Sequence, residues 1–93
     1  MRANRRDTAE HDIVDLWKRA GCEWQPMPPH IGFDGILYHD GRVFIVEIKT
    51  PPHWELTPNE LATSRRIEQA GVAYHIIDTL QGAARLIGLE IST

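Results

Sequence analysis

The chain has 93 residues, which predicts one domain over residues 1–93, and 42% hydrophobic with 25% charged residues is ordinary for a globular protein. Its formal net charge of −3 counts against a simple nucleic-acid-binding protein, which usually carries a basic face. Cys22 is the only cysteine, so an intrachain disulfide is excluded. We find no signal peptide and no apolar run near the roughly 20 residues of a membrane span, so we expect a cytoplasmic protein without membrane contact.

The first half of the sequence predicts a helix followed by a β-hairpin. Apolar side chains recur at helical spacing through residues 8–20, and Gly21 ends that helix. We expect a short edge strand over residues 22–27 and two longer strands over 33–39 and 42–50. The dipeptide Asp40-Gly41 between the longer strands is typical of a two-residue hairpin turn.

The second half predicts a strand-helix-strand crossover. The strand after the turn is apolar on both faces, which indicates a central strand covered by helices on both sides. Thr57 and Glu60 have capping-box spacing at the start of a helix over residues 57–70. A buried strand over 72–77 and a final helix over 79–87 follow. We therefore expect an α/β domain with a mixed central sheet and flanking helices, in the order α-β-β-β-α-β-α.

The hairpin places two carboxylates opposite each other. Counting outward from the Asp40-Gly41 turn pairs Asp34 with Glu47, and Lys49 shares their side of the sheet. Directly opposed residues have Cβ atoms about 4.5–5.5 Å apart, so the two carboxylates repel each other. A divalent cation that prefers oxygen ligands, Mg²⁺ or Mn²⁺, would relieve this repulsion. The alternative, which spacing does not exclude, is a frayed strand end where Lys49 pairs with one carboxylate.

Other polar groups show weaker patterns. Glu10, at the edge of the first helix's apolar stripe, either points toward the sheet or stays solvated in the first turn. Two basic groups could contact nucleic acid, although a solvated tail and helix face are more common: Arg5 with Arg6, and Arg65 with Arg66. The histidines have no paired ligand spacing, so no zinc site is expected. Trp24 and Trp54 could stack on bases or meet a second subunit, but we expect core packing.

Several motifs follow one another in a fixed order along the chain. They are Gly32-Phe33-Asp34, Asp40-Gly41, the apolar strand from Val43 to Lys49 with its Glu47-Ile48-Lys49 end, Leu56-Thr57-Pro58-Asn59-Glu60, and Gly71-Val72. This ordered set resembles the PD-(D/E)xK nuclease superfamily, and more closely its virus-type replication-repair nuclease family, VRR-Nuc. Phe33 stands where that family usually has proline, and Glu60 stands where it favours glutamine. The family's basic loop before the first acid is absent here.

The resemblance implies a restriction-endonuclease-like fold and a Mg²⁺- or Mn²⁺-dependent DNA endonuclease of DNA repair, acting as a homodimer on branched or four-way DNA. Asp34 and Glu47 would bind the metal together with the backbone carbonyl of Ile48, and Glu10 would be an outer ligand. Lys49 would position the attacking water or stabilise the transition state. The alternatives are a non-catalytic nucleic-acid-binding or assembly module that retains the fold, favoured by the acidic charge, and a nuclease that needs a partner protein.

Overall fold

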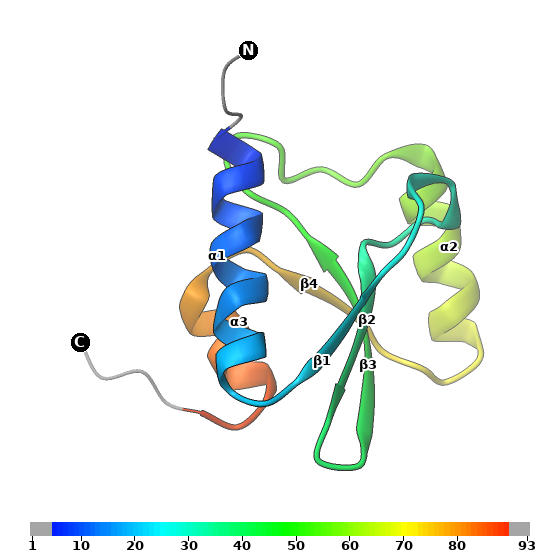
Figure 1. Cartoon of the computed structure of the whole chain (residues 1–93). Helices are drawn as coiled ribbons and strands as arrows, with labels where there is room; N and C mark the ends of the chain where they lie inside the picture. Colours follow the sequence, from blue (N-terminus) through cyan, green and yellow to red (C-terminus); the bar gives the residue numbers. More distant parts are fainter. Residues whose placement is uncertain (1–4, 90–93) are drawn as a thin grey trace.

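A computed structural model describes residues 5–89, which contain three α-helices and four β-strands (Figure 1). The elements are α1 (Arg5–Arg19), β1 (Glu23–Pro26), the short 3-10 helix η1 (Pro29–Ile31), β2 (Gly35–His39), β3 (Arg42–Ile48), α2 (Pro58–Gln69), β4 (Tyr74–Ile77) and α3 (Leu80–Leu86). The mixed α/β class expected from the sequence is confirmed. None of the helices in residues 5–89 is long and apolar enough to cross a membrane.

The four strands form one mixed sheet in the order β1-β2-β3-β4. The β1–β2 and β2–β3 pairs are antiparallel, whereas β4 runs parallel to β3 after the α2 crossover, as predicted. His39 faces Arg42 across the hairpin, and the turn residues Asp40 and Gly41 have φ angles of 52° and 77°. Both positive angles belong to the tight turn that Asp-Gly favours, so the predicted register is confirmed.

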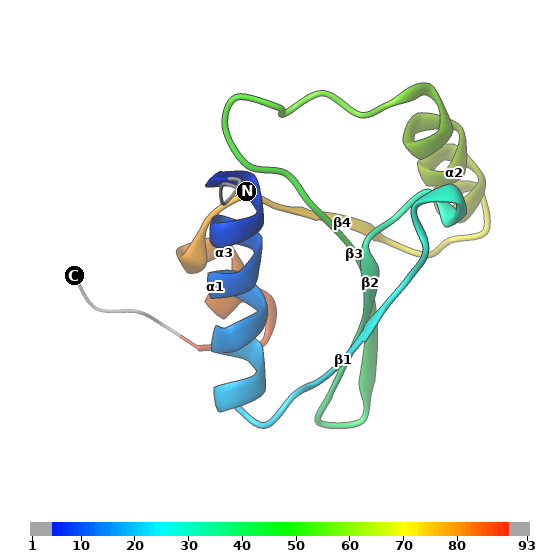
Figure 2. The same ribbon diagram turned by 45° about the horizontal axis from the view of Figure 1, so that its top comes forward.

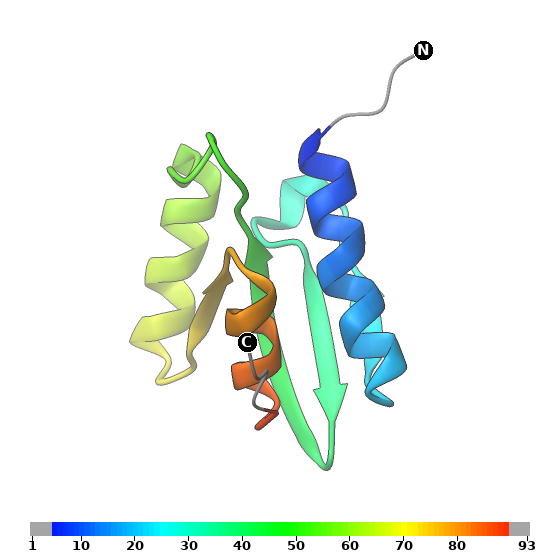
Figure 3. The same ribbon diagram turned by 90° about the vertical axis from the view of Figure 1, so that its left-hand side faces the viewer.

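Helices cover both faces of the sheet, with α1 and α3 on one side and α2 on the other (Figures 1 and 2). The hydrophobic core lies between the sheet and the α1–α3 pair, which Figure 3 shows in front of the strands. Trp17 is buried in this core, as expected, and its Nε1 donates a hydrogen bond of 2.9 Å to the Ala83 carbonyl of α3. The main core therefore lies on the face of the sheet that is opposite to α2.

The predicted element ends differ from the observed ones where loops approach the sheet. The strand expected from residue 33 begins at Gly35, because Gly32 adopts a φ of 99° in the loop after η1. The strand expected over 42–50 ends at Ile48, so Lys49 and Thr50 lie just beyond β3. The predicted capping box forms, with Thr57 accepting from the Glu60 N–H.

The α2 face of the sheet is covered less completely than the sequence pattern suggested. Alternation places Val43 and Ile45 of β3 on this face, and Val43 is 63% exposed. Ile45, Ile67 and Val72, with Arg66 and Ala70, line an apolar hollow of about 240 Å³ between β3 and α2. This face therefore combines a covered end next to Lys49 and a more open end next to the hairpin turn.

Candidate active site

Asp34 and Glu47 lie close together at the end of the β2–β3 ladder, where the charge of Asp34 contributes to the raised pKa of Glu47. The ladder itself ends at the Gly35–Val46 pair, and the N–H of Asp34 donates to the Val46 carbonyl at 3.0 Å, one residue out of step with that pairing. Because side chains alternate along a strand, Glu47 and Lys49 project from the face opposite Val46 and Ile48. Glu47 and Lys49 share one face as expected, with Asp34 nearby, whereas the expected direct pairing of Asp34 with Glu47 stays a prediction.

Asp34 is fixed by hydrogen bonds around it. Its Oδ2 accepts a hydrogen bond of 2.7 Å from the Ile48 N–H, which ties the side chain to the strand that carries Glu47. The preceding loop is held by Gly32, whose carbonyl accepts a 2.7 Å hydrogen bond from the Tyr74 hydroxyl. A Cβ atom at Gly32 would collide with the side chain of Thr63 in α2, so the loop approaches α2 as only glycine permits.

Glu47 is a buried carboxylate. Its exposed fraction is 1%, and neither of its oxygens receives a hydrogen bond from the described residues. Burial, followed by the charges of Asp34 and Glu60, raises the pKa of Glu47 from 4.5 to about 8, although Lys49 opposes the rise. Buried charged groups are costly unless they are paired or bind a metal, and Glu47 has the Lys49 ammonium 3.3 Å from its Oε2 as an ionic partner.

Lys49 lies between two carboxylates. It is 5% exposed, and its Nζ is 3.3 Å from Glu47 Oε2 and 2.7 Å from Glu60 Oε1. Burial lowers the pKa of the ammonium, but the hydrogen bond to Glu60 and the charges of both carboxylates outweigh burial, so the pKa is raised. Lys49 is therefore a cation with a fixed position, as a group acting on an anionic phosphate requires.

Glu60 has two roles in the structure. Its Oε1 accepts from the Thr57 N–H at 2.9 Å, completing the capping box, and also accepts the Lys49 ammonium. Burial raises the pKa of Glu60, but the hydrogen bonds from Lys49 and Thr57 together lower it by more than burial raises it. The pKa of Glu60 is therefore below its usual value. The capping motif identified Glu60 in the sequence, whereas its contact with Lys49 depends on how α2 packs against the sheet.

The donor set fits a magnesium-like cation. Within residues 5–89 there is no group of three or more His, Cys, Asp or Glu side chains arranged to hold a metal. Mg²⁺ is commonly held by one or two carboxylates, with water and substrate phosphate oxygens completing its coordination. Asp34 and the two oxygens of Glu47 are suitable ligands of this kind, and the Ile48 carbonyl lies next to Glu47 in the chain.

The remaining predicted site residues lie on the helices α1 and α2 that flank the sheet. Glu10 is half-buried in α1, the helix that packs on the other face of the sheet, so its assignment as a ligand stays a prediction. Arg65 and Arg66 are exposed on α2. Arg5 and Arg6 begin α1, but their side chains lie outside the described part of the structure. The predicted nucleic-acid contacts of the four arginines are untested.

The two other tryptophans differ from each other. Trp24 packs on Trp17 with ring centroids 5.3 Å apart, as expected for the core. The prediction that Trp54 packs in the core is wrong, since 57% of this residue is exposed.

No family model matches this chain, and no curated protein matches it either. The site itself consists of two adjacent carboxylates, a buried ammonium and a third carboxylate that orients the ammonium.

Proposed function

We propose that this protein is a metal-dependent DNA endonuclease of the PD-(D/E)xK type, with a restriction-endonuclease-like core and the motif order of VRR-Nuc proteins. The observation that supports this function best is the buried Glu47 carboxylate, which accepts no hydrogen bond from the described residues and lies close enough to Asp34 for the charge of Asp34 to raise its pKa. A purely structural sheet position would favour an apolar residue, because burying a charge costs stability. Strongly perturbed pKa values are concentrated at functional sites for the same reason.

Each side chain has a role in this proposal. Asp34 and Glu47, with the Ile48 carbonyl, hold Mg²⁺ or Mn²⁺, which would supply a more acidic bound water and stabilise charge on the phosphate. Lys49 donates hydrogen bonds to the attacking water or to the phosphate oxygens. Glu60 keeps the Lys49 ammonium in place through their 2.7 Å contact. Glu10 is an outer ligand.

The proposed assembly is a homodimer that acts on branched DNA. A domain of this length buries only about 60% of the surface of its unfolded chain, so a second subunit adds useful apolar burial. Val43 and the apolar hollow beside Ile45 lie on the open end of the α2 face, where a symmetric contact with another copy would cover them.

A cleavage assay tests the function directly. On a panel of linear, flapped and four-way DNA, the wild type should cut the branched substrates when Mg²⁺ or Mn²⁺ is present and leave all of them intact in EDTA. Lys49→Ala should lose cleavage, and Lys18→Ala, which removes an exposed lysine of α1, should cut like the wild type. Equal cleavage by Lys49→Ala and the wild type would reject the assigned site.

The second candidate is a non-catalytic module that binds nucleic acid or assists assembly. Two observations favour this module. The chain has a net charge of −3, and the Lys49 ammonium is already paired with the Glu60 carboxylate. DNA binding without cleavage on any of these substrates, in either metal, would support this module. Binding alone does not separate the candidates, because phosphate contacts need no catalytic site.

A further inference from the structure

The loop between β3 and α2 is closed at its base by the catalytic cluster. Lys49 stands at the start of this segment, and Glu60 Oε1 accepts both the Lys49 ammonium at 2.7 Å and the Thr57 N–H at 2.9 Å. A further backbone hydrogen bond of 2.9 Å from His53 N–H to the Thr50 carbonyl bends the first part of the loop. The loop crosses the end of the sheet between α1 and α2 (Figures 1 and 2). The two ends of the loop therefore meet at the contact between Lys49 and Glu60.

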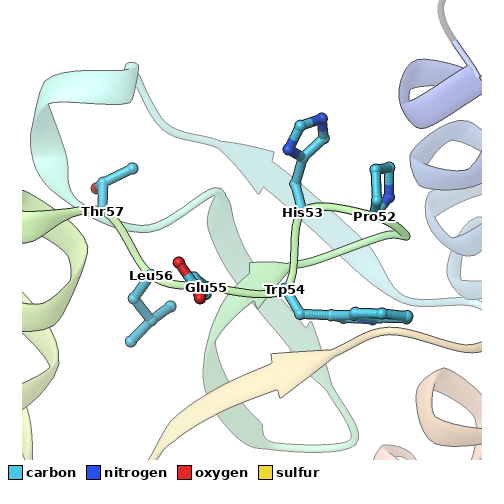
Figure 4. Close-up of a pocket in the computed structure, with 6 residues that line it drawn as sticks. All are labelled: Pro52, His53, Trp54, Glu55, Leu56 and Thr57. Carbon is cyan, nitrogen blue, oxygen red and sulfur yellow. The ribbon is translucent and has the colours of Figure 1, made fainter.

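Trp54 is the large side chain that this loop presents to solvent. It is 57% exposed, and it lines an open hollow of about 530 Å³ with its neighbours in the segment 52–57 (Figure 4). The indole of Trp54 and the imidazole of His53 project from opposite sides of the loop (Figure 4). An exposed indole on a short, anchored segment offers a flat apolar surface whose position relative to Lys49 is restricted.

Acidic side chains outnumber the single lysine of the cluster, so contacts outside the cluster have to supply much of the affinity for DNA. Glu47 and Glu60 contact the lysine and Asp34 lies close to Glu47. Glu55 adds another acid to the wall of the hollow. Proteins that bind DNA through its phosphates rely on basic side chains, which this region lacks apart from Lys49. Stacking of a base on an aromatic ring contributes affinity without positive charge and tolerates any base sequence.

We propose that Trp54 stacks on an unpaired nucleobase of the DNA strand whose phosphate occupies the cluster of Asp34, Glu47 and Lys49. This inference rests on the proposed function and narrows its substrate to DNA with unpaired bases beside the scissile phosphate. Fully paired DNA keeps its bases stacked inside the helix, so its bases reach Trp54 only at ends or branches.

Binding of a single-stranded oligodeoxynucleotide of about 12 nucleotides, within the usual span of one binding site, tests the proposal. Its affinity is measured in EDTA by fluorescence anisotropy, so that cleavage plays no part. Trp54→Ala should raise Kd about tenfold, within the range of one lost base–aromatic stack, and Trp54→Phe should retain most of the affinity. Tyr38→Ala is the matched control, since Tyr38 is an exposed aromatic near the hairpin turn, at the other end of the sheet.

Two further measurements separate stacking from a structural effect. The tenfold ratio between wild type and Trp54→Ala should be the same at about 50 and 200 mM salt, since stacking releases no counterions. In the cleavage assay Trp54→Ala should raise KM and leave kcat within about twofold. An unchanged Kd in Trp54→Ala, or a loss in Trp54→Phe as large as in Trp54→Ala, would overturn the proposal. If wild-type protein binds the oligonucleotide through Trp54 but never cuts DNA, the proposed nuclease fails and the stacking site stands.

Discussion

Replacing Glu47 with glutamine should make the metal-free protein more stable at alkaline pH. The pKa of Glu47 is raised from 4.5 to about 8, chiefly by burial. A carboxyl whose pKa is higher in the folded state contributes stability that is fully present below about pH 4.5 and is lost as the pH rises through about 8. Glutamine has nearly the same shape and no charge to lose. The two proteins should therefore diverge between these pH values.

The size of the divergence follows from the pKa. One pKa unit corresponds to about 1.4 kcal/mol, so a rise from 4.5 to about 8 sets an upper limit of about 5 kcal/mol. The pKa of about 8 already includes the opposing charge of Lys49. Relaxation of the protein and entry of water around the ionised carboxylate reduce the expected gain to about 2 kcal/mol. For a domain of this size, 1 kcal/mol shifts Tm by about 4–8 °C, so Glu47→Gln should melt roughly 10 °C higher at pH 9.

Thermal melts followed by circular dichroism in EDTA, from pH 5 to pH 9, measure this effect. The curves for wild type and Glu47→Gln should nearly coincide at pH 5 and separate steadily above it. Glu68→Gln, at an exposed glutamate of α2, is the control and should track the wild type throughout. Parallel curves for wild type and Glu47→Gln over the whole range would refute the argument that Glu47 is a strained buried acid.

The other expectations concern metal, mechanism, packing and assembly. Mg²⁺ or Mn²⁺ should raise the wild-type Tm, and Glu47→Ala should abolish this shift without unfolding the protein. Lys49→Ala should keep the metal-induced shift and lose cleavage, since its ammonium acts on water and phosphate. Gly32→Ala should lower the free energy of unfolding, measured in urea, by about 2 kcal/mol more than Gly21→Ala does. Both glycines have positive φ, but only at Gly32 would the added Cβ collide with the side chain of Thr63. Light scattering at tens of micromolar should give a dimer mass, and Val43→Asp should shift it toward the monomer; a monomeric wild type would remove the dimer from the proposal.

The local features of the site could be predicted because they depend on sequence-near interactions. The Asp40-Gly41 turn fixed the pairing of β2 with β3, and that pairing determined which side of the sheet carries Glu47 and Lys49. The capping box at Thr57 was predictable for a similar reason, since it involves residues within one helical turn.

Long-range contacts were not predictable in the same way. The contact of Glu60 with Lys49 requires α2 to lie at a particular height above the sheet, which hydrophobic periodicity does not specify. The buried side of α2 carries the small polar residues Thr63 and Ser64 for a related reason. Thr63 is small enough for the Gly32 loop to approach, and a larger apolar residue would displace that loop from α2. Trp54 was expected to pack in the core because large aromatic residues are usually buried, but it is exposed. The loop that carries Trp54 is held by polar contacts at its base, so its position does not depend on burial of the indole.

The strand order has a consequence for how the chain folds. Each strand lies beside its neighbour in sequence, so the sheet can grow from the tight hairpin by adding β1 on one side and β4 on the other. Short loops carry a small entropic cost of closure, and chains dominated by such contacts fold quickly. The hydrogen bond from Trp17 to Ala83 joins residues near opposite ends of the chain. We expect this bond to form late in folding and to break early in unfolding, so that α3 separates from the sheet before the hairpin opens.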